Sequence, residues 1–223
     1  MSLELWTAVE RYMTDLIVKQ DAALDAALAE SNAAGLPPIS VAPTEGKLLH
    51  VLALSVGARN ILEIGTLGGY STIWLARALP PGGRVISLEV DAKHAEVARR
   101  NIARAGVAGV VDIRLGKALD TLPAIAAERR ERFDLVFVDA DKQHNAEYFD
   151  WSVRLSRRGT IIIVDNVVRD GAVIDASTKD ERVLGTRRFN DALAADRRVI
   201  ATEIQTVGSK GHDGFAIAVV VDA

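Results

Sequence analysis

The residues best suited to chemistry directly follow two apolar runs of the chain. The run LVFV is followed by Asp139, Asp141 and Lys142, and the run TIIIV is followed by Asp165 and Asn166. Hard cations such as Mg2+ prefer carboxylate and amide oxygens. A single Asp at a strand end more often caps the next loop or helix. Two of them at neighbouring strand ends, with an amide alongside, favour a metal site formed by Asp139, Asp165 and Asn166.

Lys142 stands three residues after Asp139. A lysine ammonium beside a divalent cation, in a partly closed cleft, releases its proton more readily, which suits a general base near neutral pH. Lys142 is therefore the candidate catalytic residue. The alternative is an ordinary solvated lysine in a first helical turn, and it holds if the metal site is absent.

A glycine-rich segment, EIGTLGGYS (63–71), follows an earlier apolar run and precedes a helical pattern. Its glycines let backbone approach a ligand, and the helix start supplies free N–H groups. The alternative is an ordinary tight turn between strand and helix. The spacing does not match G-x-G-x-x-G, the dinucleotide fingerprint. Glu63 lies inside the apolar run, where a buried carboxylate requires a partner.

Glu89 ends the next apolar run, 24 residues after Gly65. An acid at the tip of a second strand can accept hydrogen bonds from both ribose hydroxyls of an adenosine. The alternative is a surface Glu that caps the helix following Asp91. Together with the glycine segment, Glu89 favours a cofactor that contains adenosine.

These residues need a sheet that brings strand ends together. Apolar runs rich in Ile, Val and Leu alternate with helical patterns, which is typical of a parallel sheet covered on both faces. The last two runs have no helix between them and predict a terminal antiparallel hairpin. The predicted strands are 61–64, 84–90, 110–115, 135–138, 160–164, 199–207 and 215–221.

The N-terminal part of the chain is predicted to be helical. Apolar residues spaced by three and four over 3–30 indicate one or two amphipathic helices, and the segment GLPPISVAP (35–43) ends them. A further helix is expected from Thr44, as its capping residue, to Leu54. We expect one domain over 1–223, with 1–43 as a helical extension and linker and 44–223 as the catalytic core.

Composition excludes several other classes of function. The 223 residues carry a net charge of -3, which gives no reason to expect nucleic acid or an anionic membrane as partner. The absence of cysteine excludes disulfides, thiolate metal sites and a cysteine nucleophile. No apolar run approaches the roughly 18 residues that span a bilayer, and a cytoplasmic location is expected.

The four histidines are less informative. His50 and His94 lie in helical patterns and are expected far from the strand ends, on the surface or in the core. His144 could approach the site, although a place on a helix face is favoured. His212, in the final connection, is a weak candidate for the rim of the site.

With these residues in place, the chain resembles the cation-dependent, S-adenosylmethionine-dependent O-methyltransferases, which include catechol and caffeoyl-coenzyme A O-methyltransferases and small bacterial relatives. The resemblance runs from about Ile39 to the C-terminus and depends on EIGTLGGYS, LEVD, RLGKA, FVDADK and VDN in this order. It implies a class I methyltransferase, Rossmann-like α/β sheet. That sheet has seven mostly parallel strands with an antiparallel last strand, and helices on both faces.

The resemblance also assigns roles to individual residues. Asp139, Asp165 and Asn166 match the metal ligands, and Lys142 matches the general base. The residues implied to bind S-adenosylmethionine are Ile39, Val41, Glu63, Gly65, Ser71, Glu89, Ala118, Asp139, Asp141 and Tyr148.

The implied reaction is Mg2+-dependent methylation of a hydroxyl on a catechol-like small molecule, with Ca2+ or Mn2+ as alternative cations and a homodimer as the assembly. The segment 167–185 is the expected lid over the substrate. Two other functions remain open at this stage. One is a nicotinamide-dependent oxidoreductase, and the other is a binding protein that keeps the cofactor fold without catalysis.

Overall fold

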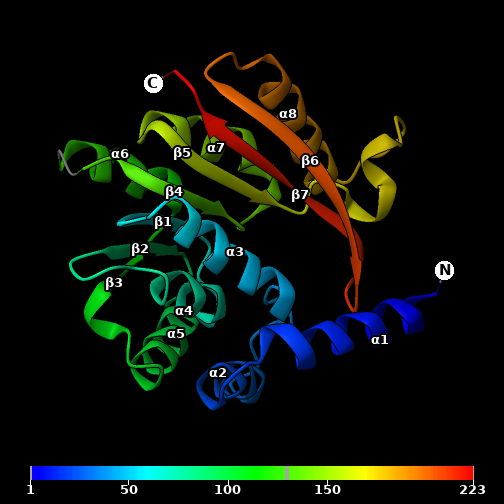
Figure 1. Cartoon of the computed structure of the whole chain (residues 1–223). Helices are drawn as coiled ribbons and strands as arrows, with labels where there is room; N and C mark the ends of the chain where they lie inside the picture. The colour runs from blue at the N-terminus through cyan, green and yellow to red at the C-terminus, as the bar shows by residue number, and fades with distance from the viewer. Residues whose placement is uncertain (1, 129–130, 223) are drawn as a thin grey trace.

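A computed structural model describes residues 2–128 and 131–222. Its centre is a seven-stranded sheet in the order β3-β2-β1-β4-β5-β7-β6 (Figure 1). The strands are β1 Asn60–Ile64, β2 Arg84–Glu89, β3 Val111–Leu115, β4 Phe133–Val138, β5 Ser156–Asp165, β6 Val199–Gly208 and β7 Gly211–Val220. All seven predicted strands are present, so the predicted α/β class is confirmed.

Strand directions also follow the prediction. β1 to β5 pair with one another in parallel, and β1 lies between β2 and β4. β7 inserts between β5 and β6 and is antiparallel to both. Chain order reverses on either side of β1 and β4, so their carboxyl ends flank the point where ligands bind in such sheets.

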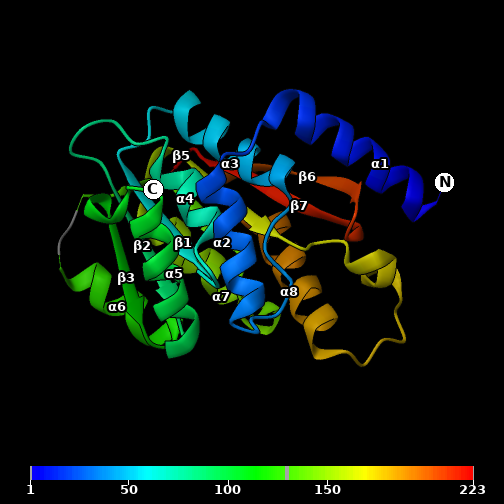
Figure 2. The same ribbon diagram turned by 90° about the horizontal axis from the view of Figure 1, so that it is seen from below.

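Helices cover both faces of the sheet (Figure 2). One face carries α6 (Ala118–Ala127), α7 (Asn145–Arg154) and α8 (Glu181–Ala195), whose apolar side chains share a buried cluster with Leu62 and Val136. The other face carries α3 (Pro43–Ser55), α4 (Tyr70–Ala76) and α5 (Ala92–Arg104), which pack with Ile61 and Leu135. Successive strand residues therefore serve opposite faces, as the pleat requires.

The N-terminal extension consists of two helices with a break between them. α1 (Leu3–Met13) continues into a wider π-helical turn (Thr14–Val18), and α2 (Ala22–Ala33) follows. Lys19 adopts a left-handed conformation at the break. α2 contributes to the buried cluster under α4 and α5, whereas α1 extends beside β6 (Figures 1 and 2).

Two short 3-10 segments lie near the carboxyl ends of β4 and β5. They are η3 (Lys142–His144), before α7, and η4 (Arg169–Ile174), which occupies the first part of the expected lid. A third, η2 (Ala108–Val110), precedes β3. In the described part of the chain, no helix has the length and apolar character needed to cross a membrane.

The predicted cap of α3 was wrong. Thr44 makes no capping hydrogen bond, because the helix begins one residue earlier, at Pro43, with Ala42 in the capping position. Proline fits the first position of a helix, where its missing N–H has no helical partner to lose. The predicted helix itself is confirmed, with its capping position two residues earlier than predicted.

Candidate active site

The strand ends of β1, β2, β4 and β5 border a cavity of about 900 Å³. This volume is ample for a nucleoside cofactor together with a small aromatic molecule. Most of the predicted site residues line it: Ile39, Val41, Gly65, Ser71, Glu89, Ala118, Asp139, Asp141, Lys142, Tyr148 and Asn166. Glu63 and Asp165 are buried and are not among the lining residues.

Gly65 makes the close approach of the β1 and β4 ends possible. Its φ of +104° is one that side chains rarely allow, and an added Cβ would lie 2.0 Å from the carbonyl oxygen of Asp139. The Asp139 N–H also donates to the Ile64 carbonyl at 2.8 Å. The glycine-rich turn is thus held directly against the first residue of the polar cluster after β4.

Glu63 lies in β1, just before the glycine-rich turn, and is held by side chains from neighbouring elements. Its carboxylate is fully buried and accepts hydrogen bonds from the hydroxyls of Ser71 (2.6 Å), Thr72 (2.5 Å) and Ser87 (2.6 Å). Burial raises the pKa of Glu63 to about 7, and the three hydroxyl donors oppose that rise. The partner that a carboxylate in an apolar run requires is therefore a set of hydroxyls on α4 and β2.

Glu89 accepts backbone hydrogen bonds at the tip of β2. One oxygen accepts from Leu67 N–H at 2.8 Å, and the other from Val90 and Asp91 N–H, both at 2.9 Å. Glu89 is buried and does not cap α5, because Asp91 performs that role. The expectation for His94 was wrong: its Nδ1 lies 3.6 Å from Glu89, and its ring lines the cavity. The first turn of α5 places it there, directly after the tip of β2.

Asp141 is organised by two side chains that follow it. The Tyr148 hydroxyl donates to it at 2.6 Å, and the ring of His144 contacts its other oxygen. Burial would raise the pKa of Asp141, but these hydrogen bonds outweigh burial and lower it. Burial and the carboxylate in turn raise the pKa of Tyr148. Asp141 is thus held as an ionised acceptor at the cavity wall.

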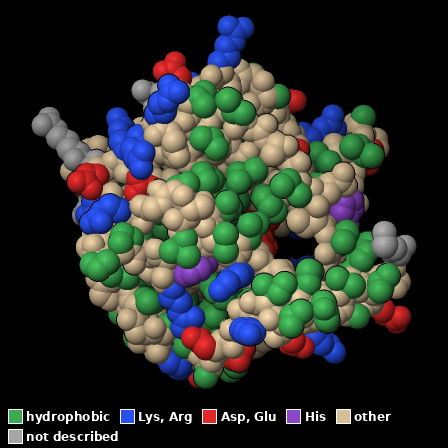
Figure 3. Space-filling view, in the orientation of Figure 1, with side chains coloured by type: hydrophobic (Ala, Val, Ile, Leu, Met, Phe, Trp, Pro, Cys, Tyr) green, Lys and Arg blue, Asp and Glu red, His purple; other side chains and the backbone are tan. Residues whose placement is uncertain are grey.

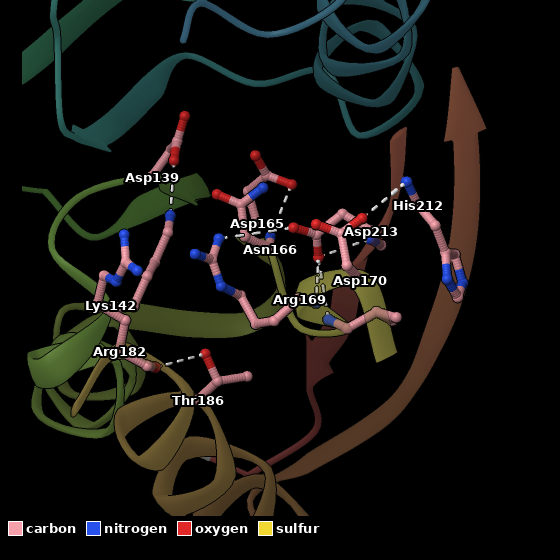
Figure 4. A network of polar contacts seen from close by, with 12 residues as sticks. Asp139, Lys142, Asp165, Asn166, Arg169, Asp170, Arg182, Thr186, His212 and Asp213 are labelled. Atoms are coloured by element: carbon pink, nitrogen blue, oxygen red, sulfur yellow. Dashed lines mark hydrogen bonds and ion pairs between the residues drawn. The ribbon is translucent and has the colours of Figure 1, made fainter. Parts of the chain in front are cut away.

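The predicted base Lys142 and the predicted ligands Asp139 and Asn166 line the cavity, and the third predicted ligand, Asp165, is buried next to Asn166 (Figure 4). Lys142 is buried, and its Nζ donates to Asp139 Oδ1 at 2.7 Å. Asn166, at a φ of +64°, donates its N–H to Asp165 Oδ1 at 2.8 Å. Burial, followed by the charge of Asp139, raises the pKa of Asp165 to about 7, although Lys142 acts in the opposite direction. The two aspartates are therefore close enough to repel each other.

Glu45 joins this cluster and was missed in the sequence. It lies in the first turn of α3, far in sequence from any strand end, and its carboxyl group is close enough to interact electrostatically with those of Asp165 and Asp139. Burial, Asp165 and Asp139 raise its pKa well above the usual range, and Lys210 opposes them. No signal in a helical pattern separates such a residue from an ordinary acid in a first turn.

The donor set fits a hard divalent cation. Within residues 2–128 and 131–222, no three Asp, Glu or His side chains form a ready cluster around one point. The predicted set instead combines two carboxylates with the amide of Asn166. Asp165 lies close enough to Asp139 for that charge to raise its pKa, and a bound cation stabilises carboxylates that are held together in this way.

The remaining histidines lie outside this cluster. His50 hydrogen-bonds to the Trp74 carbonyl through Nδ1 at 3.0 Å, as expected for a structural residue. His212 donates its backbone N–H to Asp170 at 3.2 Å and pairs with Gln205. His212 is not among the cavity-lining residues, so its weak candidacy receives no support.

The chain is similar to known O-methyltransferases over nearly its whole length. The O-methyltransferase family model matches residues 18–217. The catechol O-methyltransferase of Niastella koreensis is 51% identical over 220 residues, which cover 99% of this chain and 100% of that protein.

Solved structures give the same result for the fold. An O-methyltransferase from Bacillus cereus in complex with SAH superposes with a TM-score of 0.96 at 56% identity, covering 98% of this chain and 100% of that one. The O-methyltransferase TomG from Streptomyces achromogenes, in complex with SAM, gives a TM-score of 0.96 at 49% identity and covers 99% of each chain.

These likenesses decide between the functions that the sequence left open. A nicotinamide-dependent oxidoreductase and a non-catalytic binding protein both lose their support, since fold, strand order and family model agree on one kind of enzyme. The chain belongs to the O-methyltransferase family.

Proposed function

We propose that this enzyme transfers a methyl group from S-adenosylmethionine to one hydroxyl of a catechol-like aromatic substrate, with help from a divalent cation, most simply Mg2+. The proposal rests mainly on one feature. Oxygen donors of Asp139 and Asn166 share a single cavity with Lys142 and with the glycine-rich turn at Gly65.

The cofactor occupies the end of the cavity between the glycine-rich turn and β2. Glu89 accepts hydrogen bonds from the ribose hydroxyls, since its buried carboxylate is fixed by three backbone N–H groups. Asp141, oriented by Tyr148, binds the methionyl ammonium. The supporting contacts come from Ile39, Val41, Gly65, Ser71 and Ala118 in the wall, with Glu63 orienting Ser71 from beneath.

Asp139, Asp165 and Asn166 hold the cation in this proposal. A cation held by these residues would supply positive charge that favours the ionised form of a phenolic hydroxyl. An ordinary phenol has a pKa of about 10, so without such help the nucleophile is scarce at neutral pH. Glu45, whose carboxyl group interacts electrostatically with those of Asp165 and Asp139, adds a further oxygen donor beside this set.

Lys142 removes the proton. Its Nζ lies 2.7 Å from Asp139 Oδ1, which holds the amine at the side of the cavity where the hydroxyls bind. The phenolic oxygen attacks the methyl carbon, the carbon–sulfur bond breaks, and the proton moves to Lys142 Nζ. The rest of the catalysis is positioning, because an in-line displacement needs both reactants held in one geometry.

A homodimer is part of the proposal. Large apolar side chains remain exposed along α1 and the following turn and on β6, as the green patches on this face of the molecule illustrate (Figure 3). They are Leu3, Leu5, Val9, Tyr12, Met13, Leu16, Ile17, Ile200, Ile204 and Val207. Exposed apolar patches gathered on one face of a molecule are typical of an interface.

Methyl transfer to catechol, read by mass spectrometry, tests the proposed function. Activity is expected to disappear after EDTA treatment and to return with Mg2+. We expect Asp165→Ala to lose at least about a hundredfold in kcat/KM and to bind Mn2+ weakly by calorimetry. Asp191→Ala, which removes an exposed acid of α8, is the matched control and should retain both properties.

Two results would contradict the proposal. Full activity of metal-free enzyme would remove the role of the cation. Tight Mn2+ binding by Asp165→Ala, with activity lost, would mean that Asp165 acts through folding and not through the cation.

A further inference from the structure

One end of the cavity carries positive charge that the proposed mechanism does not use. Arg169, directly after β5 in η4, and Arg182, in the first turn of α8, both line the cavity. Their guanidinium groups come from separate elements and lie on the same side of the cavity as Lys142 and Asn166 (Figure 4). The glycine-rich turn and Glu89, which serve the cofactor, are supplied by β1 and β2.

The backbone of Arg169 is firmly positioned. Asp213 Oδ1 accepts the N–H groups of Val168, Arg169 and Gly214, each at 3.0 Å. Arg169 itself has a φ of +56°, an unusual conformation for a residue with a side chain. These contacts tie the segment after β5 to β7 and fix the direction in which the arginine leaves the backbone.

The guanidinium of Arg169, in contrast, has unused donors. Within residues 2–128 and 131–222 its Nε is buried without a hydrogen-bond partner, and its Nη1 forms a long ion pair with Asp213 Oδ2, at 3.6 Å, which is beyond hydrogen-bond distance. Only 22% of the side chain is exposed. A guanidinium keeps its charge at every physiological pH, so burying it with free donors is costly unless a ligand supplies acceptors.

Arg182 has a different status. It forms a two-point contact with Asp180, through Nε at 3.1 Å and Nη2 at 2.7 Å, and 59% of its side chain is exposed. Because its charge is already paired and solvated, Arg182 is suited to the rim of the cavity. Arg169, and not Arg182, is therefore the arginine with hydrogen-bond donors available for a ligand.

We propose that Arg169 binds a carboxylate carried by the aromatic substrate, away from the hydroxyl pair, so that the preferred substrates are acidic catechols. This inference rests on the proposed function for the hydroxyl pair. A planar guanidinium presents two parallel N–H donors that match the two oxygens of a carboxylate. Arg169 thereby selects the substrate and also orients the ring above Lys142.

Steady-state kinetics with 3,4-dihydroxybenzoate and with uncharged catechol test this inference. Arg169→Gln is expected to lower kcat/KM for the acid about tenfold to a hundredfold and to change the value for catechol less than about threefold. Arg169→Lys, which keeps the charge, should recover part of the loss. Arg187→Gln removes a charge from α8 outside the cavity and should match the wild type.

Binding of benzoate, measured by calorimetry, gives a readout that does not depend on catalysis. Benzoate has no hydroxyl to methylate, so wild-type enzyme should bind it and Arg169→Gln should not. If no catechol is methylated but this difference is found, the proposed reaction fails and the anion site stands.

Three outcomes would overturn the inference. The first is an equal loss for the acid and for catechol, which indicates a structural role. The second is equal benzoate binding by both proteins. The third is a raised KM for S-adenosylmethionine with unchanged substrate preference, which would assign Arg169 to the carboxylate of the cofactor.

Discussion

Glu63 makes the stability of the free enzyme depend on pH. The carboxyl group is fully buried, and burial raises its pKa from 4.5 to about 7, against three hydroxyl donors. The folded protein therefore holds this proton more tightly than the unfolded chain does. Between these two values the folded state binds more protons, so the free energy of unfolding falls as the pH rises.

The size of the effect follows from the shift. A rise from 4.5 to about 7 corresponds to about 3 kcal/mol in total, of which about 2.5 kcal/mol is lost between pH 5 and pH 8. Glu63→Gln has nearly the same shape and no titrating proton. The free energy of unfolding of Glu63→Gln should therefore not show this decrease between pH 5 and pH 8.

Urea denaturation, followed by tryptophan fluorescence, measures both proteins at several pH values without cofactor and with EDTA present. Asp165 also titrates near this range, so the informative quantity is the difference between the two proteins. That difference should change by about 2.5 kcal/mol between pH 5 and pH 8. If the free energies of unfolding of the two proteins changed equally with pH, the reasoning would be refuted. Ser87→Ala removes one donor to Glu63 and should move the midpoint to higher pH.

Two further predictions concern packing and assembly. Gly185→Ala would place its Cβ 2.3 Å from the Lys142 carbonyl oxygen, so α8 must shift. We expect the free energy of unfolding to fall by about 1–3 kcal/mol in urea denaturation and kcat to fall as well. Gly109→Ala is the control, because an added Cβ meets open space there, and it should change neither quantity. For the proposed dimer, the wild-type protein should sediment at twice the monomer mass, and Val9→Glu should sediment as a monomer. Ile174→Glu is the control: it also replaces an exposed apolar side chain, but one in the segment expected to form the lid, and it should stay dimeric. A monomeric wild type at micromolar concentration would count against the dimer.

The sheet could be predicted because each strand carries its own signal. The runs around Leu62, Val136 and Ile162 are apolar on both faces, which only a strand between two helical layers requires. The final hairpin was recognisable from the missing helix between its strands. Strand starts were less predictable: β5 begins at Ser156, because Ser156 pairs with Phe133 of β4, and regular pairing resumes only at Ile161 after a shift in register.

Residues at strand ends could be assigned to the site for a topological reason. In a parallel sheet, the residue after each strand must face the same edge, so Asp139, Asp141 and Asn166 reach the cavity whatever the helix packing. Glu45 and His94 lie on helices, and their position depends on the rotation of α3 and α5 against the sheet. That rotation is decided by packing among residues distant in sequence, such as Gly46 against Trp74, and has no local signature.

The end of β1 and the end of β4 form the two halves of the candidate site, and direct contact between them joins these halves into one unit. In the proposed mechanism the Gly65 turn serves the cofactor and Asp139 serves the cation, and the two are in backbone contact, since an added Cβ on Gly65 would lie 2.0 Å from the Asp139 carbonyl oxygen. Movement of one half by even an ångström therefore moves the other. In a methyl transfer, where alignment of the two reactants supplies much of the rate, such a rigid contact between the β1 and β4 ends serves catalysis directly. In the proposed mechanism, glycine at position 65 is therefore needed for the reaction as well as for the turn.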